Sequence, residues 1–274
     1  MNNKLFVVNK PLFISSNRYL SKIKRKYKVK KAGFSGTLDP FAKGCLIVAF
    51  GQYTRLFQFL KKTPKKYKAT LFLGAYSETL DIEKISKVEI PQGFDFDEVE
   101  KVVNSFKGKI TQIPPKYSAK RINGIRAYDL ARKGENVDIK KIEVEIFDIK
   151  ITNYCHPFLS FETEVSEGTY IRSLGRDIAE KLGVDGALTY LERLNEGKFV
   201  FENEKNLNPL EYLDLEKNEY LGDIENLVLG RKLNIDDFKI TKKGKYVVEF
   251  DNYFAIIEID ENVKYLLNKV ELCL

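Results

Sequence analysis

The stretch Gly33-Phe-Ser-Gly-Thr-Leu-Asp-Pro40 lies between a lysine-rich segment and the apolar run Cys45–Phe50. Its two glycines permit backbone conformations that other residues rarely adopt, and Pro40 restricts Asp39 to extended geometry. The sequence therefore predicts a carboxylate held on a rigid loop between a basic helix and a buried strand. A structural Asp-Pro turn, with the carboxylate bonded to nearby backbone amides, fits the same pattern. The rest of the chain has to distinguish the two.

The segments around this loop alternate between strand-like and helix-like patterns at irregular spacing. Residues 15–28 begin with two serines suited to cap a helix, and apolar residues recur at helical spacing after them. Strands are expected at 5–11, 45–51, 66–74, 109–112, 117–122, 144–151 and 158–165, a strand pair at 188–201 turning at 195–197, and helices at 15–28, 54–62, 96–106, 126–134 and 173–183. Residues 81–93 are interpreted as a connection. This irregular order predicts a mixed α+β fold rather than a regular βαβ series.

The composition changes after about residue 201. Residues 206–230 are acidic and helical in pattern, whereas residues 239–270 contain alternating strands around a turn at 251–252. A chain of 274 residues suits one main domain with a small appendage. We therefore expect a main domain over residues 1–205 and a small β-rich C-terminal domain over residues 206–274.

The composition also limits the classes of function. The longest apolar stretch, Cys45–Phe50, is far shorter than the ~18 residues that a membrane helix needs, and the N-terminus lacks a signal-peptide pattern. We expect a cytoplasmic protein with no membrane partner. The three scattered cysteines and the single histidine, His156, give neither a disulfide framework nor metal-ligand spacing. We therefore expect no metal site and no Ser-His-Asp triad, and interpret His156 as an ordinary loop or strand residue.

The positive charges are clustered. Lysine and arginine number 46 against 39 acidic residues, a formal net charge of +7, and residues 22–31 hold seven of these cations. Two further basic clusters occupy residues 61–68 and 116–133, while acidic residues gather at 95–100 and 202–225. This segregation indicates a basic face for a polyanion with an acidic side away from it. A solvated lysine-rich surface fits the same composition.

The Asp39 loop resembles the catalytic motif of the TruB family of tRNA pseudouridine synthases. The resemblance continues in family order over most of residues 1–200, in the blocks LFVVNKPLFISSN (5–17), KYKATLFLGAYSETLDIEK (66–84), QIPPKYSAKRINGIRAYDLARKG (112–134) and VSEGTYIRSLGRDIAEKLGVDGALTYLERL (165–194). Each block is a weak signal alone, but the ordered set is specific. It implies a largely antiparallel mixed sheet of the pseudouridine synthase type with flanking helices.

The resemblance also implies an activity and its residues. It implies isomerisation of uridine 55 in the T-loop of tRNA to pseudouridine by base flipping, with Asp39 as nucleophile and no cofactor. Arg172 matches the arginine that orients Asp39 and keeps it ionised. Tyr67 matches the ring that stacks on uracil and can assist proton transfer, and Tyr170 and Leu191 match positions that line the uracil pocket. Ordinary core packing remains an alternative for these side chains, above all for Leu191.

The chemistry explains why such residue types belong together. Pseudouridine formation breaks the N1–C1′ bond, turns the base and forms a C5–C1′ bond, so it needs no redox step, nucleotide energy or metal. It needs a nucleophile that holds one fragment while the base reorients. Whether that attack falls on the ribose or on the base stays open.

One position departs from the family pattern. Many members have histidine where Phe34 stands; a phenylalanine can still insert apolar surface into RNA but supplies no imidazole proton. The resemblance also implies that residues of about 80–150 form an insert that contributes to RNA binding, and that the shortened C-terminal domain is a reduced PUA-like RNA-binding module. The expected partner is the T-arm of tRNA, bound by a monomer.

Two other functions remain as alternatives. A non-catalytic RNA-binding protein or tRNA chaperone would use the same basic surface without needing Asp39. A glycosidase-like hydrolase would pair Asp39 with a second carboxylate, but no partner acid stands in a matching loop. The joint presence of Asp39, Tyr67, Tyr170 and Arg172 favours the synthase.

Overall fold

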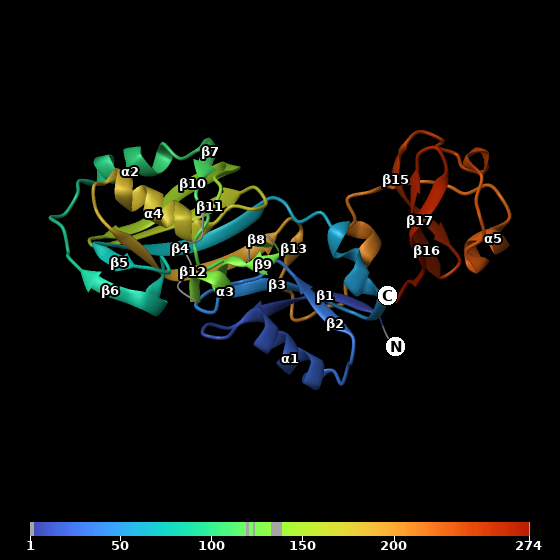
Figure 1. Cartoon of the computed structure of the whole chain (residues 1–274), viewed down its shortest axis with the longest axis horizontal. Helices are drawn as coiled ribbons and strands as arrows, with labels where there is room; N and C mark the ends of the chain where they lie inside the picture. The colour runs from blue at the N-terminus through green and yellow to red at the C-terminus, as the bar shows by residue number, and fades with distance from the viewer. Residues whose placement is uncertain (1–2, 119–120, 123, 133–138, 274) are drawn as a thin grey trace.

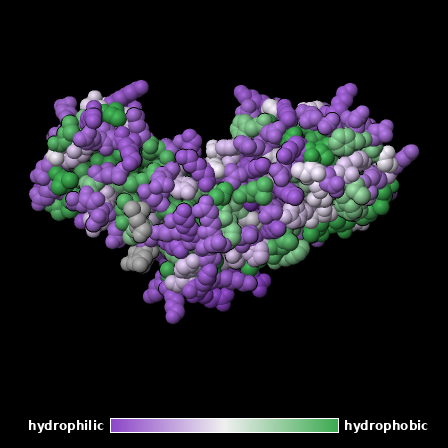
Figure 2. Space-filling model, turned by 180° about the vertical axis from the view of Figure 1, so that it is seen from behind, coloured by the Kyte–Doolittle hydropathy of each residue, from purple (hydrophilic) through white to green (hydrophobic). Residues whose placement is uncertain are grey.

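The computed structural model describes residues 3–118, 121–122, 124–132 and 139–273. Two lobes of different size make up the molecule (Figure 1): a large lobe around one long sheet, and a small red-coloured lobe at the end of the chain. From the opposite side a notch separates the two lobes at the upper edge, and hydrophilic side chains cover much of that face (Figure 2). No helix in the described ranges is long and apolar enough to span a bilayer.

The large lobe is built on a nine-stranded mixed sheet with the order β1-β3-β12-β4-β11-β10-β7. All neighbours along this path are antiparallel except β3 and β12, and β2 and β13 add to β3 and β12 at the side. The strands are β1 (Lys4–Lys10), β2 (Ala32–Ser35), β3 (Lys43–Phe50), β4 (Lys65–Leu73), β7 (Gly108–Gln112), β10 (Ile142–Cys155), β11 (Phe158–Val165), β12 (Gly186–Glu196) and β13 (Phe199–Val200). The expected α+β class with a largely antiparallel sheet is confirmed.

Helices cover this sheet with their apolar sides. On α4 (Ile171–Lys181), Leu174 and Ile178 are fully buried and belong to the same core cluster as Leu71 of β4. Helix α2 (Phe96–Asn104) adds Val99 and Val103 to that core, and the two helices lie side by side over the sheet (Figure 1). The predicted helical segments 96–106 and 173–183 are therefore confirmed, although Phe96 itself is exposed.

Helix α1 (Ser16–Lys26) carries most of the first basic cluster. The Ser15 side chain caps it by accepting a hydrogen bond from the Arg18 amide, as its sequence predicts. Ile23 is its buried apolar residue, packed with Phe6 and Val48 of the sheet, so the lysines project from the other sides. The segregation of charge is incomplete, because Lys26 pairs with Glu204 of the acidic segment at 2.6 Å.

Several connecting segments differ from the sequence-based expectation. Residues 51–58 form a 3-10 helix, η1 (Gly51–Gln58), where an α-helix over 54–62 was expected. The supposed connection 81–93 contains η2 (Ile82–Lys84) and the strand β6 (Ile85–Val88), which pairs with β5 (Ala75–Ser77). In the described part of 117–122, which leaves out 119–120, the one strand is β8 (Arg121–Ile122), and β9 (Ile125–Arg126) and α3 (Ala127–Arg132) follow it. Gly134, the expected end of that helix, and Lys133 lie outside the described residues.

The small lobe is a four-stranded sheet in the order β14-β15-β16-β17. Its strands are β14 (Glu216–Lys217), β15 (Gly244–Phe250), β16 (Tyr253–Ile259) and β17 (Val263–Glu271). The expectation of a helical segment at 206–230 is wrong: it contains only η3 (Pro209–Glu211), β14 and the short α5 (Ile224–Leu229), and η4 (Ile235–Asp237) follows. Leu207 explains the difference, because it joins the buried cluster of Leu5 and Val247 between the lobes, and packing there outweighs helical propensity. The proposed boundary at residue 205 stays a prediction.

Candidate active site

The loop between β2 and β3 carries Asp39, and two neighbouring segments fix it. Gly36 has φ +67°, and a Cβ there would lie 2.9 Å from the carboxylate oxygens of Glu196, so the turn requires glycine. The Ser16 hydroxyl accepts a hydrogen bond from the Leu38 amide and donates to the Leu38 carbonyl, both at 3.0 Å. The loop backbone that carries Asp39 is therefore fixed by the two segments it packs against, β12 and the start of α1.

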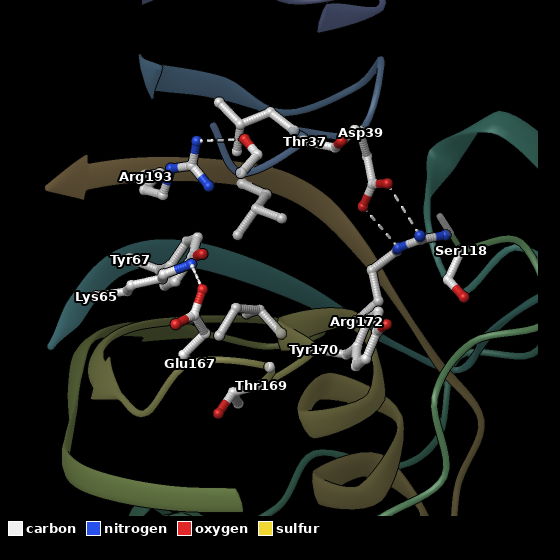
Figure 3. A pocket seen from close by; sticks show the side chains of 15 residues that line it. Thr37, Asp39, Lys65, Tyr67, Ser118, Glu167, Thr169, Tyr170, Arg172 and Arg193 are labelled. Carbon is white, nitrogen blue, oxygen red and sulfur yellow. Dashed lines mark hydrogen bonds and ion pairs between the residues drawn. The ribbon is translucent and has the colours of Figure 1, made fainter. Parts of the chain in front are cut away.

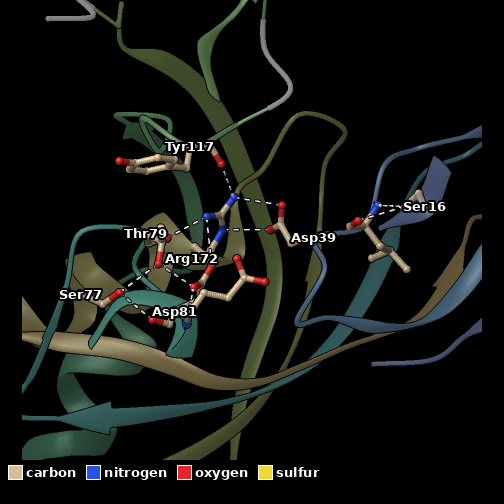
Figure 4. Close-up of polar contacts among 9 residues, drawn as sticks. Ser16, Asp39, Ser77, Thr79, Asp81, Tyr117 and Arg172 are labelled. Carbon is tan, nitrogen blue, oxygen red and sulfur yellow. Dashed lines mark hydrogen bonds and ion pairs between the residues drawn. The ribbon is translucent and has the colours of Figure 1, made fainter. Parts of the chain in front are cut away.

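Arg172, at the start of α4, holds that carboxylate with two contacts. Its Nε lies 2.9 Å from Asp39 Oδ2, and its Nη2 donates to Asp39 Oδ1 at 3.0 Å (Figures 3 and 4). The remaining donors meet the Thr79 carbonyl at 2.7 Å, the Tyr117 carbonyl at 2.8 Å and Asp81 Oδ2 at 3.2 Å. All five N–H groups of the Arg172 guanidinium thus have partners. The orientation of this planar group is therefore fixed before any substrate binds.

Asp81 is a site residue that sequence reasoning missed. It is 2% exposed and accepts hydrogen bonds from the Thr79 hydroxyl at 2.6 Å and from the Glu83 amide at 3.0 Å. Burial raises the pKa of its carboxyl, against the lowering effects of the Thr79 hydrogen bond and the charge of Arg172. The chain thus surrounds Arg172 with two carboxylates, one buried and one facing the pocket (Figure 4). The available signal was the quoted run SETLD, whose Ser77, Thr79 and Asp81 alternate at strand spacing.

A pocket of about 370 Å³ opens in front of Asp39, within the size range of small-ligand sites. Five of the six predicted site residues line it: Leu191 and the four that Figure 3 labels, Asp39, Tyr67, Tyr170 and Arg172. Tyr67 and Leu191 are 7% and 5% exposed and form its apolar floor on β4 and β12. Burial raises the pKa of the Tyr170 phenol, which favours its neutral form.

A buried charge cluster supports the other side of the pocket. Arg193 and Glu196 on β12 are 2% and 0% exposed and pair at 2.7 Å, and Lys65 approaches the same carboxylate at 3.3 Å. Arg193 also donates to the Gly36 carbonyl at 2.8 Å and is paired in register with Tyr67. Burial lowers the pKa of Arg193, but the charge of Glu196 and the contact with the Tyr67 phenol outweigh it and raise the pKa. Arg193 is therefore the cation beside Tyr67, whereas all N–H groups of Arg172 are directed at other partners.

Two other residues singled out in the sequence lie away from this pocket. Phe34 pairs with Val48 across β2 and β3 and packs half-buried against the cluster that contains Ile23, outside the pocket lining. His156 contacts the Pro91 carbonyl at 2.9 Å and the Tyr154 hydroxyl at 3.3 Å. Tyr154 lies at the hairpin end of β10, and Pro91 lies in the segment between β6 and α2, so His156 has an ordinary structural position, as expected. The described residues contain no cluster of potential metal ligands.

Comparisons with known proteins find a matching family model and relatives that are similar over nearly the whole chain. The family model described as "TruB family pseudouridylate synthase (N terminal domain)" matches residues 24–171. A tRNA pseudouridine synthase B of Sulfurovum is 55% identical over 269 residues, covering 98% of this chain and 97% of the relative. The protein of the same name from Campylobacter jejuni serotype O:2 is 54% identical, covering 99% and 100%.

Solved structures share the fold at low sequence identity. A chain in a crystal structure of a Cbf5-Nop10-Gar1 complex is 19% identical, with a TM-score of 0.65 over 98% of this chain and 84% of that chain. A chain in the structure of an H/ACA RNP bound to a substrate RNA containing 2′-deoxyuridine has a TM-score of 0.62 at 19% identity, covering 99% and 85%. The likeness therefore extends over both lobes.

Proposed function

The chain belongs to the TruB family of pseudouridylate synthases, which are isomerases, and on that premise we propose that it converts uridine 55 in the T-loop of tRNA to pseudouridine. The relatives that share more than half of its residues are named tRNA pseudouridine synthase B. The observation that carries the proposal is the ion pair of Arg172 and Asp39 at the edge of a pocket large enough for one nucleotide.

The proposed reaction begins with extrusion of the uridine from the folded RNA into this pocket. Extrusion costs a few kcal/mol, and contacts from basic residues to phosphates offset that cost and set the register. Phe34, beside the catalytic loop, contributes apolar surface that fills the space left by the base. Stacking on the Tyr67 ring and contact with Leu191 then hold the uracil beside Asp39.

Within the pocket Asp39 acts as the nucleophile. Arg172 orients its carboxylate, since the planar guanidinium contacts both carboxylate oxygens. Asp39 bonds to one fragment, through C1′ of the ribose or C6 of the uracil, and the N1–C1′ bond breaks. The uracil turns, the C5–C1′ bond forms, and the bond to Asp39 is broken, which restores its carboxylate. The proton on C5 leaves with assistance from the Tyr67 oxygen, and N1 gains a proton, so the atoms balance and no cofactor is consumed.

The binding partner in this proposal is the T-arm of tRNA. Residues of about 80–150 act as an insert that contacts the RNA, and residues 206–274 act as a small PUA-like module along the same substrate. The enzyme works as a monomer in the cytoplasm, where its substrate is made.

The experiment that tests the proposal is to incubate the protein with an unmodified tRNA transcript and map pseudouridine at single-nucleotide resolution. Conversion at position 55 that is lost in the Asp39→Asn variant supports it. Binding of tRNA without conversion would favour a chaperone that uses the same surface, and conversion at another position would overturn the proposed specificity.

A further inference from the structure

Phe13 lies on the loop between β1 and α1 and combines an unusual backbone conformation with high exposure to solvent. Its φ is +58°, in the left-handed region, and 68% of the residue is exposed. A bulky residue rarely adopts this conformation, because its Cβ crowds the backbone. No apolar burial compensates the strain at Phe13. Strained residues persist where the surrounding structure holds them, and they gather at ligand-binding sites.

The loop that bears Phe13 is fastened to the catalytic loop. Lys10 is completely buried, and its Nζ donates to the Ile14 carbonyl at 2.7 Å and to the Pro40 carbonyl at 3.3 Å. Ser16 bonds the backbone of Leu38 from the other end of the same loop (Figure 4). Phe13 is therefore held in fixed relation to the backbone on either side of Asp39.

A row of cations continues from this loop along α1. Arg18, Lys22 and Arg25 are exposed and stand at positions i, i+4 and i+7, so they share one side of the helix. None of the three forms an ion pair with an acidic side chain in the described part of the chain. An exposed aromatic ring next to unpaired cations is the combination that binds unpaired nucleic acid, through base stacking and phosphate contacts.

We propose that Phe13 is an RNA-binding residue: its ring stacks on an unpaired base near the target uridine, and Arg18, Lys22 and Arg25 bind phosphates of the same strand. This inference rests on the proposed function and adds a specific contact outside the pocket. Stacking at Phe13 helps to hold the loop of the RNA open while the uridine occupies the pocket, without taking part in the chemistry.

The test compares Phe13→Leu, which removes the ring, with Phe13→Trp, which keeps an aromatic face. Phe201→Leu is a matched control, because Phe201 is 41% exposed after β13 and lies outside the segments proposed to bind RNA. Single-turnover assays on an unmodified tRNA transcript give the half-saturating enzyme concentration and the maximal rate, and filter binding gives Kd independently. We expect Phe13→Leu to weaken both binding measures by about 5- to 100-fold at an unchanged maximal rate. Phe13→Trp and Phe201→Leu should bind like wild type.

A second variant separates stacking from folding. Phe13→Gly relieves the backbone strain, so its melting temperature should be no lower than that of wild type while RNA binding weakens as in Phe13→Leu. Asn203→Gly, another exposed position with positive φ (49°), controls for the backbone change alone. Wild-type affinity in Phe13→Leu would overturn the inference, as would a change of oligomeric state in place of a change in RNA affinity. Failure of the wild-type protein to form pseudouridine would instead overturn the proposed function.

Discussion

Two guanidinium nitrogens of Arg172 contact the two carboxylate oxygens of Asp39 at 2.9 and 3.0 Å, and the third nitrogen lies 3.2 Å from the Asp81 carboxylate. The pair joins residues 133 positions apart in the chain. Because Asp39 retains one-third of its side-chain exposure and Arg172 is almost fully buried, the carboxylate faces the pocket while the cation is shielded from water. A partly desolvated charge pair of this kind is preorganised for chemistry rather than for stability alone.

Asp39→Asn should abolish pseudouridine formation and leave RNA binding nearly unchanged. The amide keeps the size and shape of the side chain but lacks the nucleophilic charge. A single-turnover assay and a binding assay on the same tRNA transcript measure the two effects separately. Substantial turnover by the purified variant would remove Asp39 from the mechanism.

Arg172→Lys should lower the maximal rate by about 100-fold or more. One ammonium cannot replace a planar fork that contacts Asp39, Asp81 and two backbone carbonyls at once. Breaking the buried pair should also reduce the free energy of unfolding by about 3 kcal/mol, which denaturant titration measures. Arg176→Lys is the matched control on α4, because Arg176 pairs with Asp177 at the partly exposed surface. Equal rates in the two lysine variants would show that a nearby positive charge is sufficient.

Asp81→Asn should lower the maximal rate at unchanged RNA affinity. The asparagine oxygen can still accept a hydrogen bond from Thr79. The amide, however, sets either a neutral oxygen or an N–H group against Arg172, which weakens the contact that orients the guanidinium toward Asp39. Glu78→Gln is the control, an exposed carboxylate in the same segment that pairs with Lys84 at 3.1 Å. A variant that binds poorly yet reacts at the wild-type rate once saturated would contradict a positioning role for Asp81.

The two roles of Tyr67 separate in a pair of variants. Tyr67→Phe keeps the ring and loses the oxygen, so it should bind tRNA normally and react about 100- to 10,000-fold more slowly if the oxygen transfers the proton. Tyr67→Leu should add a binding defect, because stacking on an aromatic ring is worth about 1–3 kcal/mol. A wild-type single-turnover rate in the phenylalanine variant would leave Tyr67 as a stacking platform alone.

Replacing Lys22, Lys28 and Lys30 together with glutamine should weaken tRNA binding and flatten its dependence on salt. Each lost phosphate contact should lower the log–log slope by about 0.7 to 0.9. The matched control replaces Lys181, Lys198 and Lys205, which are exposed and lie outside the basic clusters and outside the segments proposed to bind RNA. If both triple variants show the same slope as wild type, the basic cluster of residues 22–31 faces away from the RNA.

The sequence alone indicated most local elements and the candidate reacting group. The unbroken apolar run of β3 predicted a buried strand, the serines before α1 predicted its start, and the ordered motifs singled out Asp39 and Arg172. The strand and the helix start are encoded within a few residues, by side-chain period and capping, whereas Asp39 and Arg172 were identified through the resemblance of the ordered motifs to the TruB family. Such local patterns predict a strand or a helix start without knowledge of which distant segments pack against it.

Only the tertiary structure decided which charges surround that group. Asp81 reaches Arg172 across 91 positions of sequence, and Arg193, rather than Arg172, lies beside Tyr67 because β12 and β4 pair in that register. The segment 206–230 has a helical pattern yet is mostly irregular, since Leu207 packs into the cluster between the lobes. Contacts of this kind depend on strand register and on burial between distant segments, and neither is encoded in the local order of residues.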